Sequence, residues 1–397
     1  MKNILRPGTM SAADIRPELA LQQPDWGDVS QIQHVRAELA ARPALVNAVD
    51  VYNLRNLLAS VAVGSAYVIQ AGDCAEDPAE RTAADIARKV GLLEVLAGTI
   101  RMNTRKPVLR VGRIAGQFAK PRSNDYERVG GLDLPVYRGH SVNAPEPTLE
   151  HRRPDAFRMV SCYEAAAEIM HHLSWRGRHR RSWTDAPVWT SHEALLLDYE
   201  IPFLREDASG QLLLGSTHWP WIGERTRDVD GAHVAMLAEV ANPVACKVGP
   251  NIDADELLAL CERLDPEREP GRLTLVARMG ADLVADRLPR LVSALRSAGH
   301  PVIWLCDPMH GNTVSVPGLG KTRYLDAIVR ETRLFQQAVR GAGGIAGGLH
   351  LETTPEGVTE CVTNEQFLDR AGGKRTSLCD PRLNPDQAVA VVSQWRG

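Results

Sequence analysis

Positively charged side chains follow several short apolar segments of this chain, and their types suit the binding of small anions. These cations are Arg113, Lys120, Arg122, Arg225, Lys247 and Arg278. Guanidinium groups bind phosphate and carboxylate oxygens through paired hydrogen bonds, and a lysine ammonium adds a point charge. Gathered on one face, six such residues would form a site for a small and strongly anionic substrate.

A second set of residues has the donor types of a divalent-metal site. It consists of one thiol, one imidazole and two carboxylates: Cys74, His310, Glu352 and Asp380. Together they would complete a mixed nitrogen, oxygen and sulfur shell for Mn, Fe, Co or Zn. Their long spacing in the sequence leaves the alternative open that the cysteine is a small buried side chain and the carboxylates cap helices.

The segments that precede these side chains predict strands. Eight short apolar or β-branched runs have this character, at residues 66–69, 108–111, 188–190, 219–222, 244–248, 273–277, 302–306 and 345–351. Amphipathic stretches that predict helices lie between them and begin near Asp85, Arg158, Asp228, Asp253 and Thr322, with a further one around Leu288. The chain is therefore assigned to the α/β class.

The alternation of strands and helices predicts the architecture. Strands that are apolar on both faces and separated by helices form parallel sheets, and eight of them favour a closed (β/α)8 TIM barrel. A doubly wound open sheet is the alternative. In a barrel the carboxyl ends of all strands meet at one mouth, so we expect the cations and the metal-ligand types to converge there.

The first part of the chain carries two helical patterns before the first strand, one around Ile32 and one around Leu54. We expect residues 1–62 to form a short N-terminal helical extension and residues 63–397 to form the barrel that carries the site.

Composition excludes several classes of protein. The chain has 397 residues, and 46 Lys and Arg against 49 Asp and Glu give a net charge of −3. This balance removes the positive field of sequence-independent nucleic-acid binders, and the basic segment 175–183 is interpreted as a solvated loop or an oligomer contact. No apolar run is long enough to span a membrane. Seven scattered cysteines without a C-x-x-C pair, and no secretion signal, predict a cytoplasmic protein.

The polar segments at the predicted strand ends resemble a known family, the class II 3-deoxy-D-arabino-heptulosonate 7-phosphate (DAHP) synthases. The segments that carry the resemblance run in order along the chain and are residues 72–76 (GDCAE), 113–123, 223–227, 246–250 (CKVGP), 307–312 (DPMHGN), 351–352 and 379–384. The resemblance implies a (β/α)8 barrel that condenses phosphoenolpyruvate with erythrose 4-phosphate and water to give DAHP and phosphate, the first step of the shikimate pathway.

The resemblance also implies roles for individual residues. Cys74, His310, Glu352 and Asp380 would hold a divalent metal, Mn²⁺ or Co²⁺, with Zn²⁺ or Fe²⁺ possible. The residues that would bind phosphoenolpyruvate are Arg113, Arg225, Lys247 and Arg278, together with the backbone of Glu224. Those that would bind the sugar phosphate are Lys120, Arg122 and Ser123.

Catalysis needs a group that manages the proton of the water added at C2 of phosphoenolpyruvate. Our hypothesis assigns this role to Glu224 together with Lys247, next to the cation Arg113.

A further hypothesis is that Cys379 and Cys74 are close enough to form an inactivating disulfide.

The chain is similar to the short members of the family, which lack the extensions that bind aromatic amino acids. We therefore expect no feedback inhibition and a role in the secondary metabolism that makes antibiotics or pigments. The resemblance also implies a homo-oligomer, dimer or tetramer, and we expect the N-terminal helices around Ile32 and Leu54 to form part of its contact. Two alternatives stay open at this point. One is an amino-DAHP synthase that uses an imino sugar phosphate, and the other is a non-catalytic barrel that partners a chorismate enzyme.

Overall fold

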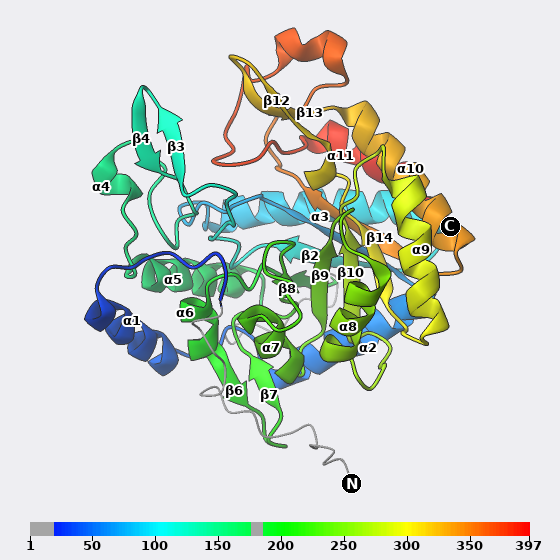
Figure 1. Ribbon diagram of the computed structural model, residues 1–397, viewed down its shortest axis with the longest axis horizontal. Coiled ribbons are helices and arrows are strands. Elements are labelled where there is room, and N and C mark those ends of the chain that lie inside the picture. Colours follow the sequence, from blue (N-terminus) through cyan, green and yellow to red (C-terminus); the bar gives the residue numbers. More distant parts are fainter. Residues whose placement is uncertain (1–19, 176–185) are drawn as a thin grey trace.

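A barrel of eight parallel strands forms the centre of the computed structural model, which describes residues 20–175 and 186–397 (Figure 1). Its strands are β1 (Tyr67–Gly72), β2 (Val108–Arg113), β5 (Val188–Thr190), β8 (Trp221–Ile222), β9 (Val244–Val248), β10 (Leu273–Ala277), β11 (Ile303–Cys306) and β14 (Ile345–Glu352). Each strand pairs with its neighbours in this series except at β5 and β8, and β14 pairs with β1. All eight predicted strands are confirmed.

The ring closes between β5 and β8. The segment that follows β5 forms a parallel bridge between Glu193 and Trp221. The amide of Trp221 donates to the carbonyl of His192 at 3.0 Å, and the amide of Ala194 donates to the carbonyl of Trp221 at 3.0 Å. The prediction of a (β/α)8 barrel is thereby confirmed, and the open sheet is excluded.

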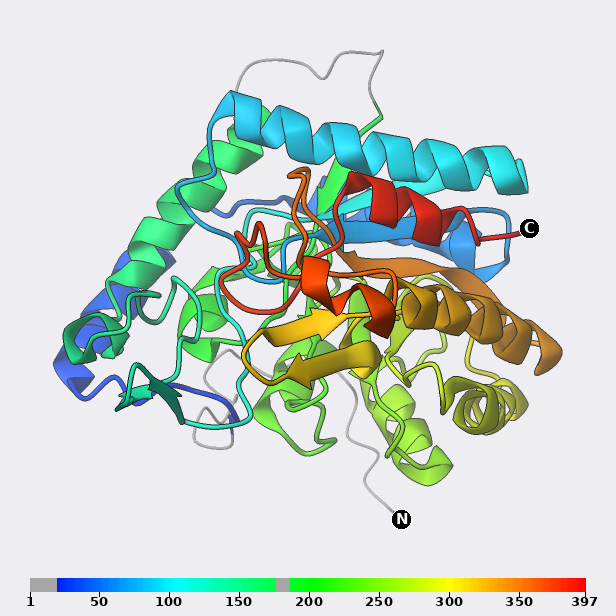
Figure 2. The ribbon, with the colours of Figure 1, turned by 90° about the horizontal axis from the view of Figure 1, so that it is seen from above.

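Helices surround the barrel (Figure 2). The longer ones that follow its strands are α3 (Ala83–Thr104), α5 (Arg158–His172), α7 (Ala232–Glu239), α8 (Ala254–Leu264), α9 (Val284–Ser297), α10 (Leu325–Gly341) and α11 (Pro385–Val392). Thr82 and Asp85 cap α3 reciprocally, and Asp253 caps α8. The helix expected near Thr322 begins at Leu325 instead, because residues 320–323 are a strand. No helix in the described part of the chain is long and apolar enough to cross a membrane.

Two helices precede the barrel, α1 (Val29–Ala41) and α2 (Ala48–Ala62). Leu54, Leu58 and Val61 of α2 are fully buried in the same apolar cluster as Val68 and Ile303 inside the barrel. Helix α2 therefore covers the amino-terminal end of the barrel. Because Leu54 and the α1 residue Ile32 are both buried within the chain, their side chains are not available for contacts with a second copy.

Short elements extend the loops between strands. Antiparallel hairpins are β3 (Tyr126–Val129) with β4 (Leu132–Pro135), β6 (Leu204–Glu206) with β7 (Leu212–Leu214), and β12 (Thr313–Val316) with β13 (Gly320–Arg323). Short helical turns are α4 (Leu149–Arg152), α6 (Leu197–Glu200), η3 (Ile201–Phe203), η4 (His310–Asn312) and η5 (Glu365–Arg370). The β12–β13 hairpin stands above the carboxyl ends of the barrel strands (Figure 1). Nearly all of the basic segment 175–183 lies outside the described residues.

Candidate active site

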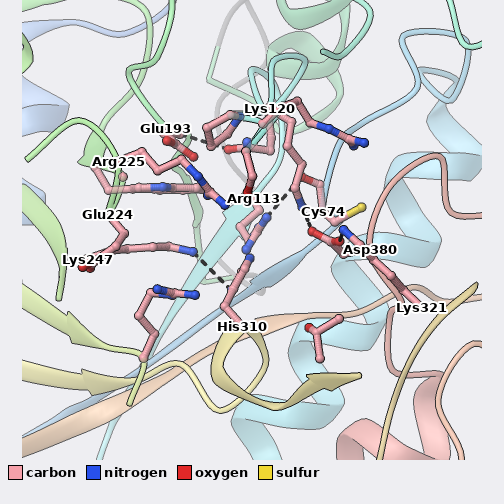
Figure 3. Close-up of a pocket in the computed structure, with 18 residues that line it drawn as sticks. Cys74, Arg113, Lys120, Glu193, Glu224, Arg225, Lys247, His310, Lys321 and Asp380 are labelled. Carbon is pink, nitrogen blue, oxygen red and sulfur yellow. Dashed lines mark hydrogen bonds and ion pairs between the residues drawn. The ribbon is translucent and has the colours of Figure 1, made fainter. Parts of the chain in front are cut away.

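The carboxyl ends of the barrel strands open into a pocket that is continuous with solvent (Figure 3). Most of the residues singled out in the sequence line it, namely Cys74, Arg113, Lys120, Arg122, Ser123, Glu224, Arg225, Lys247, Arg278, His310 and Asp380. The remaining one, Glu352, is fully buried and lies 3.2 Å from the Nε2 atom of His310. Convergence of these residues, which span more than 300 positions of the sequence, is what a barrel mouth achieves.

Three of the four predicted metal ligands form a compact group. One ligand atom each of His310, Glu352 and Asp380 lies within 4.8 Å of the others. The sulfur of Cys74 does not belong to this group, although Cys74 lines the same pocket, and its Sγ lies 3.3 Å from the hydroxyl of Ser377. One imidazole and two carboxylates fit a borderline divalent cation.

The imidazole of His310 is held in a fixed orientation. Its Nδ1 atom lies 2.7 Å from Oδ2 of Asp307, and its amide donates to the same carboxylate at 3.2 Å. Burial alone would raise the pKa of Asp307, but His310 and Lys247 hold it well below its usual value. Because Asp307 is a carboxylate that accepts from Nδ1, the Nε2 atom is left as the ligand that faces Glu352.

Cations surround the two carboxylates of the group. Glu352 accepts from Arg323 at 2.7 Å, from Arg113 at 3.2 Å and from Lys120 at 3.3 Å. Asp380 pairs with Lys120 at 2.6 Å and with Lys321 at 2.9 Å. Burial raises the pKa of both acids, but these neighbours, with His310 next to Glu352, lower it below the usual value. Both side chains are therefore negative at neutral pH, as metal ligands must be.

Cys74 is also prepared for ionisation. A hydrogen bond from the Cys379 thiol outweighs burial and, with Lys120 nearby, lowers the pKa of Cys74 to about 6. Both cysteines are free thiols. At neutral pH Cys74 is thus a thiolate, which is the form that binds metals.

Asp73, which precedes Cys74, belongs to a buried network of ion pairs. Asp73 pairs with Lys89 at 2.9 Å and with Arg382 at 2.6 Å, and Arg382 also pairs with Glu360 at 2.9 Å. All four side chains are buried. This network fixes the segment that carries Cys74 against the segment that carries Asp380.

Glu76 organises the loop after β2. Its carboxylate accepts the backbone amides of Ala115, Gly116 and Gln117 at 3.1, 2.9 and 2.7 Å. A Cβ atom at Gly116 would lie 2.0 Å from Nδ1 of His192, so only glycine fits there. The loop places Arg113 at its start and Lys120 near its end.

The cations predicted to bind substrate differ in burial and in how many partners they already have within the protein. Arg113 is buried 5.3 Å above the Trp221 ring and donates to His350 at 2.8 Å, besides Glu352. Lys247 donates to Asp307 at 3.1 Å, and burial lowers its pKa despite that partner. By contrast, Arg225 lies at the exposed rim, where it donates to Ser123 at 2.6 Å.

Sequence reasoning missed several residues of the site. Glu193 and Trp221 line the pocket next to the predicted cations, and Lys321 and Arg323 reach the metal-ligand carboxylates from β13. Glu193 follows a strand and was available to the strand-end argument. Lys321 and Arg323 were not, because they belong to a hairpin whose position above the barrel has no local sequence signal.

Comparison with known proteins gives a consistent result. The profile of the Class-II DAHP synthetase family matches residues 10–176 and 168–394. A probable phospho-2-dehydro-3-deoxyheptonate aldolase of Pseudomonas fluorescens is 57% identical over 378 residues, 95% of this chain and 94% of that protein. A phospho-2-dehydro-3-deoxyheptonate aldolase of Streptomyces coelicolor is 38% identical over 421 residues, 94% of each chain. One of Mycolicibacterium smegmatis is 37% identical over 426 residues, 94% of this chain and 91% of that protein.

Proposed function

The chain belongs to the Class-II DAHP synthetase family, and from this premise we propose that it condenses phosphoenolpyruvate with erythrose 4-phosphate and water to give DAHP and phosphate. The reaction requires a divalent metal, Mn²⁺ or Co²⁺ in the first place and Zn²⁺ or Fe²⁺ as alternatives. The observation that carries the proposal is the convergence of the cations with the His310, Glu352 and Asp380 group in one pocket.

Different residues of the pocket serve the two substrates. Arg113, Arg225, Lys247 and Arg278, with the backbone of Glu224, bind the carboxylate and phosphate of phosphoenolpyruvate. Lys120, Arg122 and Ser123 bind the sugar phosphate. Holding both anions with fixed cations aligns C3 of the enol with the aldehyde carbon and offsets the repulsion between the substrates.

His310, Glu352, Asp380 and, through its thiolate, Cys74 would hold the metal. When bound, it supplies Lewis acidity that polarises the sugar aldehyde. Asp307 and Arg323 keep the ligands oriented from outside the group.

Four bonding changes complete the reaction. A bond forms from C3 of phosphoenolpyruvate to the aldehyde carbon, the aldehyde oxygen takes a proton, water adds its oxygen to C2, and the C2–O bond to phosphate breaks. Glu224 accepts the proton that water loses, and Lys247 donates one to the aldehyde oxygen and regains it from Glu224. As phosphate departs, it takes the proton of the new C2 hydroxyl.

Two glutamates of the pocket compete for the role of base. Oε2 of Glu224 is buried and has no hydrogen-bond partner in the described part of the chain, while its Oε1 accepts from Arg227 at 3.1 Å. Oε1 of Glu193 is buried without a partner in the same way. We expect Glu224→Gln to lower kcat by about a hundredfold or more with substrate binding retained. If Glu193→Gln has that effect and Glu224→Gln does not, the role belongs to Glu193.

The decisive experiment follows phosphoenolpyruvate consumption in the presence of erythrose 4-phosphate. The enzyme is treated with chelator, assayed, and assayed again after addition of Mn²⁺ or Co²⁺, with DAHP identified by mass. We expect activity to disappear with chelator and to return with metal. Activity that is unchanged by complete metal removal would contradict metal dependence.

The remaining outcomes separate the alternatives. An enzyme that binds metal but leaves phosphoenolpyruvate untouched with erythrose 4-phosphate would point to an imino sugar phosphate as the second substrate. A chain that binds neither metal nor phosphoenolpyruvate would be a barrel without catalytic function.

We further propose that this is a short, unregulated member of the family that serves secondary metabolism. The alignment with the Streptomyces coelicolor protein spans 421 positions, more than the 397 residues of this chain, so that relative carries segments without a counterpart here. We expect the rate to be unchanged when Phe, Tyr or Trp is added to the assay. Each would be added at about 1 mM, which is about the upper end of ordinary KM values. Inhibition by any of them at micromolar concentration would refute the absence of regulation.

We also propose a homo-oligomer, dimer or tetramer, that works in the cytoplasm. The free state of all seven cysteines supports a reducing compartment. Light scattering coupled to gel filtration measures the oligomeric state, and a monomer at micromolar concentration would contradict it.

A further inference from the structure

Glu331 is a buried carboxyl group that lies outside the pocket, on helix α10. One of its oxygens accepts the backbone amide of Gly280 at 2.9 Å, and the other accepts the side-chain amide of Asn312 at 2.5 Å. Neither contact is required to form the helix or the barrel. Both partners belong to loops at the mouth of the barrel.

The two loops carry different parts of the site. Gly280 follows Arg278 by two residues in the loop after β10, and Asn312 follows His310 by two residues in the loop after β11. The backbones of the loops touch, because a Cβ atom at Gly311 would lie 2.4 Å from the amide nitrogen of Gly280.

Asn312 extends the connection. Its Oδ1 accepts the amide of Ala281 at 3.1 Å, and its Nδ2 also donates to the carbonyl of Pro308 at 2.8 Å. A single carboxyl group, directly and through one amide side chain, therefore holds both loops.

We propose that Glu331 is a positioning residue that holds the Arg278 loop against the His310 loop and so sets the phosphoenolpyruvate site relative to the metal site. The inference rests on the proposed function. Carbon–carbon bond formation needs the enol and the aldehyde at one fixed distance, and small displacements of reacting groups cost much of the rate.

A role in packing alone does not account for a carboxyl group at this position. Burial raises the pKa of Glu331 to about 8, which shows that the surroundings disfavour its charge. An apolar side chain would fill the same space without that cost, but it would leave the Gly280 amide without its acceptor and the Asn312 side-chain amide with the Pro308 carbonyl alone.

The test compares Glu331→Ala with Gln336→Ala, a matched control on the same helix. Gln336 is also buried, donates to the carbonyl of Gln394 at 3.1 Å and accepts the amide of Arg396 at 2.9 Å. It thus holds the C-terminal segment instead of the loops. For each variant we would measure Mn²⁺ affinity by electron paramagnetic resonance, phosphoenolpyruvate affinity by tryptophan fluorescence without the sugar, KM, kcat and Tm.

We expect Glu331→Ala to weaken both Mn²⁺ and phosphoenolpyruvate binding by about tenfold or more. Gln336→Ala should lower Tm by about as much as Glu331→Ala does. It should leave the affinities for Mn²⁺ and phosphoenolpyruvate within about twofold of wild type, since its partners are remote from the site. Glu331→Gln, which keeps one acceptor oxygen, should fall between wild type and Glu331→Ala, and it carries the test if the alanine variant does not fold. The effect of Glu331→Ala should also be smaller in an Asn312→Ala background, because the link from Glu331 to the His310 loop is then already broken while its bond to Gly280 remains.

Affinities in Glu331→Ala that match those in Gln336→Ala, or a loss confined to only one of the two ligands, would overturn the proposal. Failure of the proposed function gives a different result: the wild-type protein would then show no turnover of phosphoenolpyruvate. The two binding measurements do not depend on turnover.

Discussion

Asp307 lies 2.7 Å from the Nδ1 atom of His310 and 3.1 Å from the ammonium of Lys247. One carboxylate thus orients a predicted metal ligand and a predicted catalytic lysine at the same time. Asp307 is fully buried, so its negative charge is not screened by water.

Replacement of this carboxylate should weaken metal binding although Asp307 is not a ligand. An amide in Asp307→Asn removes the charge that favours the Nδ1–H tautomer of His310, and we expect Mn²⁺ affinity to fall about 10- to 100-fold. Titration of Mn²⁺ by electron paramagnetic resonance measures this. Asp282→Asn, which changes an exposed aspartate paired with Arg330, is the control and should leave the affinity unchanged. Equal affinities in the two variants would contradict the assigned role.

The pKa of Cys74 predicts how metal binding depends on pH. With a pKa of about 6, lowered by the hydrogen bond from Cys379, the thiol is ionised above pH 6 and protonated below it. Protons therefore compete with the metal at Cys74 only below pH 6. There, protonation of Cys74 should lower the metal affinity by a factor that approaches about tenfold per pH unit. A thiol with the ordinary value of 9.0 would lose affinity between pH 9 and 6 as well.

Titration of Mn²⁺ between pH 5 and 8.5 tests this in the wild type and in Cys74→Ser. The serine variant should lack the Cys74 component, so that its slope below pH 6 is less steep by about one tenfold step per unit. Identical slopes in both proteins would mean that Cys74 does not bind the metal.

Arg382 should contribute strongly to stability. Arg382→Met leaves the buried carboxylates of Asp73 and Glu360 without their shared partner, and we expect the free energy of unfolding to fall by about 3 kcal/mol or more. Arg333→Met removes an exposed arginine that bonds only to Gln394 among the described residues, so it should change this free energy by about 0.5 kcal/mol at most. Urea unfolding measures the free energy of unfolding of both variants. Equal losses in the two would contradict a special contribution of the buried network.

Two glycines should respond to alanine in opposite directions. In Gly116→Ala the new Cβ meets the His192 ring, and we expect destabilisation by about 1–3 kcal/mol and a lower kcat/KM for erythrose 4-phosphate, because the loop carries Lys120. In Gly98→Ala, on helix α3, no atom lies within 4 Å of the new Cβ, and the variant should gain about 0.5–1 kcal/mol. Thermal unfolding of the pair tests whether the contact with His192, and not loss of glycine as such, is responsible.

Local sequence patterns were sufficient to predict the barrel strands and most of the helices. Runs such as 244–248 and 273–277 are apolar on both faces, which only a covered parallel sheet accommodates, and their boundaries agree with β9 and β10. Two helices begin later than expected, one at Ala232 instead of near Asp228 and one at Leu325 instead of near Thr322. In the second case the residues before the helix pair with β12 in a local hairpin, and this strand pairing overrides the helical preference.

The sequence by itself determined the chemical types at the strand ends, and with them eleven residues that line the pocket. Tertiary structure decided which of these residues touch: that Asp307 orients His310, that Arg323 reaches Glu352 from a hairpin, and that the Cys74 sulfur lies outside the compact ligand group. The physical reason is range. Hydrophobic periodicity acts between near neighbours in the chain and leaves a readable pattern, whereas contacts between segments that are distant in sequence depend on how the loops pack.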